Sequence, residues 1–269
     1  MSFDINGFLG EQIEDIHKQI CQDNKGLLDF VLELNRLAQE IKYKLEIHNE
    51  DAQELTIGAL YIKTLQSFNS IVILSLRGLE SDSKALLRVM LEAAFYLKAT
   101  CIDDNFVFEY INGDELERFK IINRIVHDKG NVFSEEAKKY ATRDKLEELK
   151  SKIPPKKDNP LEIHKVAEKA KMNDFYQLVY GHLSADVHTS VRSIEKYYGL
   201  DENGKVIYFD CIPRTDSLNV TLSTACSILI TILDCCTEFF KLNYTEVLNN
   251  KIEWLKEFDK NVVSKADIT

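Results

Sequence analysis

The most constraining feature of the chain is the stretch Ala85–Leu97, which is apolar on every side of a helical projection except for two charged side chains. A helix that is apolar all round is normally buried, and a charge inside a buried helix is costly unless it is paired. The two charges, Arg88 and Glu92, are four residues apart and therefore share one face of a helix. We expect a buried central helix whose ion pair meets a third polar partner on a neighbouring helix.

Composition favours helices in the rest of the chain as well. Ten Gly and four Pro in 269 residues leave few helix breakers, and 45% hydrophobic residues suffice for a core. The strand propensity of Val206–Phe209, after the turn cluster Asp201–Gly204, predicts a small β-hairpin near 197–212. The expected fold is therefore all-α, a multi-helix bundle with this hairpin inserted. We expect three consecutive parts of one compact unit: N-terminal helices at 1–50, a central bundle with the polar motif at 51–198, and the hairpin with the C-terminal helices at 199–269.

Several stretches decide how the helices are arranged. Ile71–Leu76 is continuous enough for a buried strand, but the helical spacing before it favours a helix. One helix is expected from Asp174 to about Tyr197, and a helix break is expected at 112–113, an Asn-Gly pair. The last long helix has alternating four–three apolar spacing, which is typical of a seam that either lies inside the bundle or pairs with another subunit. The seam residues are Leu218, Leu222, Ala225, Leu229, Ile232, Cys236 and Phe239. Such an apolar helix face favours a homodimer or a higher oligomer.

A second polar motif lies about ninety residues after the first. Tyr180, Ser184 and His188 are spaced i, i+4 and i+8, so they line one stripe of the expected helix. One interpretation is a polar tie, in which these groups satisfy the Arg88–Glu92 pair inside the bundle. The other is a shallow site, with His188 as acid or base and Arg88 holding an anion.

Together the two motifs resemble those of a large bacterial family. Leu-Leu-Arg88-x-x-x-Glu92-Ala on one helix, followed far downstream by Tyr180-x-x-Leu-Ser184-x-x-x-His188, is similar to a family of helical proteins catalogued as a domain of unknown function. The resemblance covers about Leu55 to Tyr198 and implies an all-helical fold.

A looser similarity is to the HEPN superfamily, helical bundles found among bacterial toxins and antiviral effectors. Many members cut RNA without a metal, using an Arg followed four to six residues later by His. The chemistry needs one group to move the proton of the 2′-hydroxyl and a cation to hold the phosphate. No Arg precedes a His at that spacing in this chain. In this hypothesis His188 and Arg88 act from separate helices, and Tyr180, Ser184 and Glu92 support them.

Two functions of different classes follow from these motifs. The first is a helical interaction or regulatory protein of a bacterial toxin, stress or phage-defence system, in which a protein partner binds an exposed surface. The second is a HEPN-like, metal-independent endoribonuclease effector that uses His188 and Arg88.

Charge bears on the choice of partner. The net charge of −10 disfavours nucleic acid and anionic membranes on average. Residues 138–171, however, hold eleven basic and six acidic side chains, so this segment carries +5 and the remainder −15. RNA, or an acidic protein partner, could bind this basic segment. The candidate contacts are Lys150, Lys152, Lys156 and Lys157.

The remaining signals are mostly negative. Six cysteines without a Cys-x-x-Cys pair indicate reduced thiols, and neither a metal site nor a cofactor is expected. The N-terminal residues lack the basic start and apolar run of a signal peptide. The apolar stretch Ala225–Phe240 contains Asp234 and Glu238 and is expected to be too short to span a bilayer. We therefore expect a soluble, cytoplasmic protein.

Overall fold

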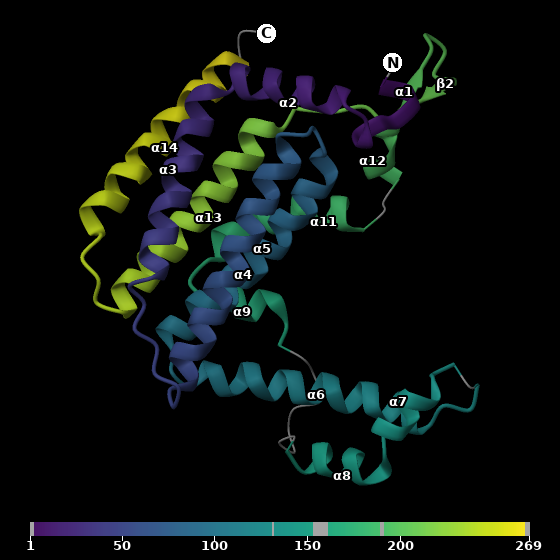
Figure 1. Cartoon of the computed structure of the whole chain (residues 1–269), viewed down its shortest axis with the longest axis vertical. Coiled ribbons are helices and arrows are strands. Elements are labelled where there is room, and N and C mark those ends of the chain that lie inside the picture. Colours follow the sequence, from purple (N-terminus) through teal and green to yellow (C-terminus); the bar gives the residue numbers. More distant parts are fainter. Residues whose placement is uncertain (1–2, 131, 153–160, 189–190, 267–269) are drawn as a thin grey trace.

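A computed structural model describes residues 3–130, 132–152, 161–188 and 191–266 (Figure 1). The protein is mostly helical with one small antiparallel hairpin, which confirms the expected fold class. Long helices form the main bundle, and the shorter elements attach to its ends and one side. The long bundle helices are α3 (Lys25–Lys42), α4 (Ala52–Ser75), α5 (Glu80–Ile102), α13 (Leu218–Phe239) and α14 (Thr245–Ala266).

The centre of the bundle is α5, which packs against both α4 and α13. Most of its apolar residues are buried, as the sequence predicted: Met90, Leu91, Ala94, Phe95 and Leu97 are fully enclosed, whereas Ala85, Leu86, Val89 and Tyr96 are half-buried. Helix α13 contacts α3, α4, α5 and α14. Six of its seven seam residues are buried and the seventh, Phe239, is half-buried. The seam therefore lies inside the bundle of a single chain, as the first of the two predicted arrangements requires.

Helix α4 begins and ends at residues whose local chemistry explains its length. The Asp51 carboxylate accepts hydrogen bonds from the backbone N–H groups of Gln53 and Glu54, as expected of an N-cap. The helix continues through residues 71–75, so the helical interpretation of that apolar run is confirmed. The chain then turns at Gly78, whose φ is +73°. A side chain at Gly78 would also collide with Pro213, so only glycine fits this turn.

The N-terminal elements lie across one end of the bundle (Figure 1). They are α1 (Phe3–Asn6), η1 (Gly7–Leu9) and α2 (Gln12–Asp23).

Helix α6 (Phe106–Val126) projects sideways from the bundle and carries two short helices, α7 (Glu135–Tyr140) and α8 (Arg143–Lys152) (Figure 1). The helix is continuous through residues 112–113, so the expected break there was wrong. Its outer end is held by a small separate apolar cluster of Ile122, Ala141, Leu146 and Leu149.

The segment from 161 to 212 is more broken than its sequence suggested. The expected single helix from Asp174 to Tyr197 is divided into short pieces, and one of them is a π-helical turn. In chain order these elements are α9 (Ile163–Lys169), α10 (Asn173–Phe175), the π-turn η2 (Tyr176–Tyr180), α11 (Gly181–Val187), α12 (Val191–Ile194), η3 (Glu195–Tyr197), β1 (Tyr198–Leu200) and β2 (Val206–Phe209). The predicted hairpin is confirmed, with Tyr198 paired to Phe209 and Gly199 to Tyr208.

Two helices in the described residues, α4 and α13, are long and apolar enough to cross a membrane by length and composition alone. The expectation that the second was too short was wrong, because α13 begins at Leu218 and not at Ala225. Within the most apolar 18-residue window of each helix, 72% of α13 and 44% of α4 is buried inside the protein. The core helix of a soluble protein satisfies the same test, so a soluble, cytoplasmic protein stays a prediction.

Candidate functional site

Four of the five predicted catalytic residues meet where α11 packs on α5. Arg88 donates three side-chain hydrogen bonds: from Nε to Glu92 Oε1 at 3.2 Å, from Nη1 to Ser184 Oγ at 2.8 Å, and from Nη2 to the Tyr180 hydroxyl at 2.7 Å. The Tyr180 hydroxyl in turn donates to Glu92 Oε1 at 2.7 Å. We call Arg88, Glu92, Tyr180 and Ser184 the Arg88 cluster. The predicted third partner of the ion pair is thus a tyrosine and a serine together.

Aromatic packing holds Tyr180 in this position. Its ring is stacked on Tyr176 with centroids 5.2 Å apart and lies 6.3 Å from that of Phe95 on α5. The guanidinium carbon of Arg88 is 4.3 Å from the Tyr180 ring centroid, within the range of a cation–π contact. Tyr180 and Ser184 are four residues apart at the start of α11, directly after the π-turn Tyr176–Tyr180, so both reach the same guanidinium.

Burial gives the cluster its electrostatic character. The Arg88 side chain is only 14% exposed, whereas that of Glu92 is 38% exposed. Burial raises the pKa of Tyr180, and the hydrogen bond to Glu92 adds to that rise. The tyrosine therefore stays protonated and acts as a donor to the carboxylate across the physiological range.

His188 is not part of the Arg88 cluster. Helix α11 ends at Val187, and His188 is its C-cap with φ −99° and ψ +118°. The His188 N–H still donates to the Ser184 carbonyl at 3.0 Å, and the backbone leaves helical geometry at His188 itself. The imidazole is exposed, and the described residues give it no hydrogen bond to any member of the cluster. The expectation that an imidazole meets the guanidinium and the carboxylate was therefore wrong.

A protein-family model for a family of unknown function (DUF5677) matches residues 54–206, more than half of the chain. The chain belongs to the DUF5677 family. No match was found among curated proteins or solved structures.

The DUF5677 match runs from the first turn of α4 to the start of β2, and thus contains all five predicted catalytic residues. It agrees closely with the region, about Leu55 to Tyr198, over which the two motifs resembled a family of unknown function. The similarity to the HEPN superfamily stays a proposal.

Four of the eight described lysines of the basic segment are paired with acids of the same segment, and two more are paired with acids outside it. Lys152 lies 2.7 Å from Glu148, and Lys150 lies 3.9 Å from Glu147. Lys156 and Lys157 lie outside the described residues. Helices α7 and α8 sit at the outer end of α6, away from α11 (Figure 1). This part of the basic segment therefore does not border the Arg88 cluster.

Metal and thiol chemistry find little support in the described part of the chain. No group of three His, Cys, Asp or Glu side chains there is arranged to hold a metal ion. All six cysteines are free thiols. Burial raises the pKa of Cys226, which makes this thiol a poor nucleophile.

Sequence reasoning missed the degree to which the hairpin is exposed. All four residues of β2 are exposed and apolar, and Phe209 retains 79% of its accessible surface. The lack of polar alternation in Val206-Ile-Tyr-Phe209 is the signal that could have indicated it. A strand at the surface of a bundle normally alternates apolar and polar side chains.

Proposed function

We propose that this DUF5677 member is a helical interaction protein that self-associates through its β-hairpin. The observation that carries the proposal is an exposed apolar surface, which we call the hairpin surface. It consists of Leu200, Val206, Ile207, Tyr208, Phe209 and Ile212, each between 40% and 79% exposed. An apolar surface of this kind on an otherwise charged protein marks an interaction site.

The hairpin has the properties of an incomplete sheet. Within the described residues it contains only two strands, and the outer edges of β1 and β2 are both unpaired there. A two-stranded sheet by itself is marginally stable in water, and monomeric proteins protect edge strands with charges or proline. Strand β2 carries neither. Its backbone edge and its side chains on both faces are therefore available to a partner strand.

The base of the hairpin is firmly attached to the bundle. The N–H of Asp210 donates to the Tyr197 carbonyl at 2.9 Å, and the N–H of Arg214 donates to the Gly78 carbonyl at 2.9 Å. The hydroxyl groups of Tyr197 and Ser81 lie 3.0 Å apart. The hairpin is thus held at a fixed place beside the turn between α4 and α5.

A second copy of the chain is the partner that fits this surface. Two β2 strands related by a two-fold axis would pair antiparallel and form a continuous four-stranded sheet with β1 at each outer edge. With roughly 180 Å² for each large apolar residue, the exposed fractions correspond to about 600 Å² per copy. The pair would then bury about 1,200 Å², at the lower limit of stable specific interfaces.

The Arg88 cluster has an architectural role in this proposal. Each nitrogen of the guanidinium donates to a side chain of the same protein, so three of its five N–H groups are engaged within the cluster. The cluster fastens α11 to α5, and α11 leads into the segment that ends in the hairpin. The proposed setting, a bacterial toxin, stress or phage-defence system, rests on the resemblance of the motifs. The ribonuclease alternative requires RNA to reach the remaining N–H groups of Arg88, whose side chain is only 14% exposed.

The oligomeric state in solution tests the proposal. We expect the wild-type protein to be a dimer by light scattering coupled to size exclusion, and Ile207→Lys to be monomeric with unchanged helix content. Ile73→Lys is the matched control, because Ile73 is equally exposed (58%) but lies on α4. A monomeric wild type would contradict the proposal. A dimer that survives Ile207→Lys but dissociates with Ile73→Lys would place the interface on a helix face instead.

A further inference from the structure

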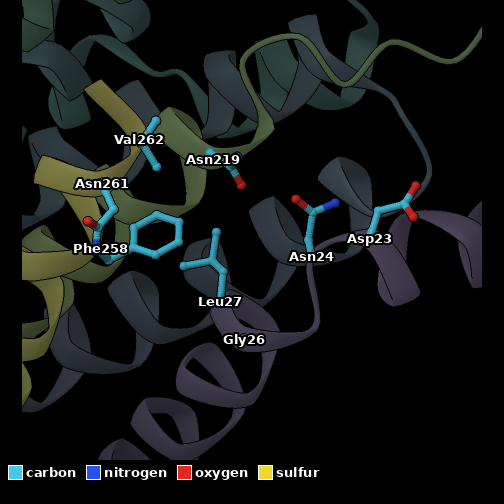
Figure 2. A pocket seen from close by; sticks show the side chains of 8 residues that line it. All are labelled: Asp23, Asn24, Gly26, Leu27, Asn219, Phe258, Asn261 and Val262. Carbon is cyan, nitrogen blue, oxygen red and sulfur yellow. The ribbon is translucent and has the colours of Figure 1, made fainter. Parts of the chain in front are cut away.

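A cavity of about 480 Å³ lies at the end of the bundle opposite to the α6 arm. Four segments that are far apart in the sequence form its wall: the end of α2, the first turns of α3 and α13, and the last turns of α14 (Figure 2). The lining residues are Asp23, Asn24, Gly26, Leu27, Asn219, Phe258, Asn261 and Val262. Its volume falls within the range of sites for small molecules.

One wall of the cavity is the end of an aromatic stack. Phe30 and Trp254 are parallel with centroids 4.0 Å apart, and Trp254 and Phe258 are parallel with centroids 5.4 Å apart. Phe30 is buried in the core, whereas Phe258 is half-buried and lines the cavity. Trp254 covers one face of the Phe258 ring. A flat ring that enters the cavity can continue the stack on the other face.

Carboxamides surround this aromatic wall. Asn24, Asn219 and Asn261 all line the cavity, and Figure 2 shows Asn24 and Asn219 on one side of Leu27 with Phe258 on the other. Asn24 uses its Nδ2 to donate to the Ile20 carbonyl at 2.9 Å, which keeps its oxygen as an acceptor. Within the described residues, the half-buried amide of Asn219 has no hydrogen-bond partner. A carboxamide offers a donor and an acceptor side by side, as the edge of a purine does.

Charge excludes a strongly anionic ligand. Asp23 is the one ionisable side chain among the lining residues, and no lysine or arginine is present among them. Its Oδ1 accepts from Gln19 at 2.8 Å, and the second carboxylate oxygen can accept from a ligand amino group. Among the lining residues that the structure describes, a phosphate would meet this negative charge without a compensating cation.

We propose that this cavity binds an uncharged aminopurine ring, as in adenine or adenosine. The purine stacks on Phe258, Asn219 pairs with its edge, and Asp23 at the rim disfavours phosphorylated forms. The aromatic stack supplies affinity for any flat ring, and the carboxamides supply the preference for a ring with adjacent donor and acceptor groups.

Titration of the full-length protein with adenosine, measured by calorimetry, tests the proposal. We expect saturable binding, and a weaker affinity for adenosine 5′-monophosphate than for adenosine. Trp254 is the single tryptophan of the chain and is stacked on Phe258, so its emission should change with the same dissociation constant.

Substitutions locate the binding site. Phe258→Leu should weaken adenosine binding about tenfold or more, because stacking on an aromatic ring is lost. Asn219→Ala should weaken it by a similar factor, and its amide has no structural partner in the described residues to lose. Asn250→Ala is the matched control, since Asn250 is exposed on α14 and does not line the cavity. If Phe258→Leu fails to fold, Asn219→Ala carries the test.

Three results would overturn the proposal. The first is no binding of adenosine up to about 5 mM, a concentration at which even weak sites are occupied. The second is an affinity that neither Phe258→Leu nor Asn219→Ala changes, which would place the binding elsewhere. The third is tighter binding of the monophosphate than of adenosine. None of these results depends on whether the hairpin mediates dimerisation.

Discussion

The hydroxyl of Tyr180 lies 2.7 Å from Nη2 of Arg88 and 2.7 Å from Oε1 of Glu92, so one side chain bridges both members of the ion pair. It accepts from the cation and donates to the anion. Tyr180 is only 8% exposed, and the bridge therefore joins the π-turn before α11 to the central helix in a largely dry environment.

Loss of the Arg88 guanidinium should lower the stability of the protein, because the Arg88 cluster has an architectural role. Arg88→Met leaves the Tyr180 and Ser184 hydroxyls and the Glu92 carboxylate with fewer partners, at a cost of about 2 kcal/mol. The melting temperature should fall by about 4–8 °C in a chain of this size. His188→Ala is the comparison: the side chain is exposed, so its effect should stay within about 0.5 kcal/mol. RNA cleavage that disappears in His188→Ala at an unchanged melting temperature would instead support the ribonuclease alternative.

The bridge should be visible as a coupling energy between Arg88 and Tyr180. In a double-mutant cycle of Arg88→Met and Tyr180→Phe, measured by urea denaturation, we expect a coupling of about 1 kcal/mol or more. Each single substitution already removes the shared hydrogen bond, so the double variant should be more stable than additivity predicts. Tyr244→Phe is the control, because its hydroxyl donates to Glu40 at 2.6 Å, away from the cluster. If the coupling energy between Arg88→Met and Tyr180→Phe is as small as that between Arg88→Met and Tyr244→Phe, the Arg88 cluster is not cooperative.

The sequence was informative where the signal was local. Burial of the central helix follows from its all-round apolar pattern, the start of α4 from Asp51, and the hairpin from a strand next to a turn cluster. The Arg88–Glu92 pair follows from its i, i+4 spacing, and its meeting with Tyr180 and Ser184 follows from the stripe on the downstream motif.

Other features depend on tertiary packing and carry little local signal. The end of α11 at Val187 has no Gly or Pro beside it, so the position of His188 could not be read from the spacing. The π-turn before α11 likewise has no local signal in the sequence. The cavity beside Phe258 joins residues 23–27, 219 and 258–262, and no local pattern connects these segments.

Acid should weaken the attachment of α13 to α5 through Glu80. Its carboxylate lies 2.7 Å from Lys84 and accepts from the backbone N–H of Ser217 at 3.1 Å. Burial acts to raise the pKa of Glu80, but these hydrogen bonds outweigh it and the pKa is lowered below its usual 4.5. A carboxyl group with a lowered folded-state pKa stabilises the protein above its unfolded-state pKa. This contribution is lost as the pH falls through the folded-state value.

The free energy of unfolding of Glu80→Gln should therefore differ most from wild type at neutral pH, and the two should converge as the pH falls through the folded-state pKa of Glu80. Denaturation in urea at a series of pH values measures this difference. Glu253→Gln is the control, since its ion pair with Lys256 is exposed and joins two residues of the same helix. A difference between Glu80→Gln and wild type that does not change with pH would contradict the assigned role.

The close contact between Gly199 and Tyr208 should control the hairpin surface. The Tyr208 ring lies so close over Gly199 on the paired strand that a Cβ at this position would overlap it. Gly199→Ala should therefore push the ring away and change the outer face of β2, while the bundle beneath stays intact. We expect a dimer dissociation constant raised about tenfold or more, corresponding to about 1.4 kcal/mol, and a melting temperature of the diluted monomer close to that of wild type. Sedimentation equilibrium measures the dimer dissociation constant, and circular dichroism measures the melting temperature.

Gly204→Ala is the comparison variant. Gly204 lies in the hairpin turn, where its φ is +77°, so this substitution should strain the turn without touching Tyr208. If both glycine variants dimerise as the wild type does, the strands of this hairpin are not the interface.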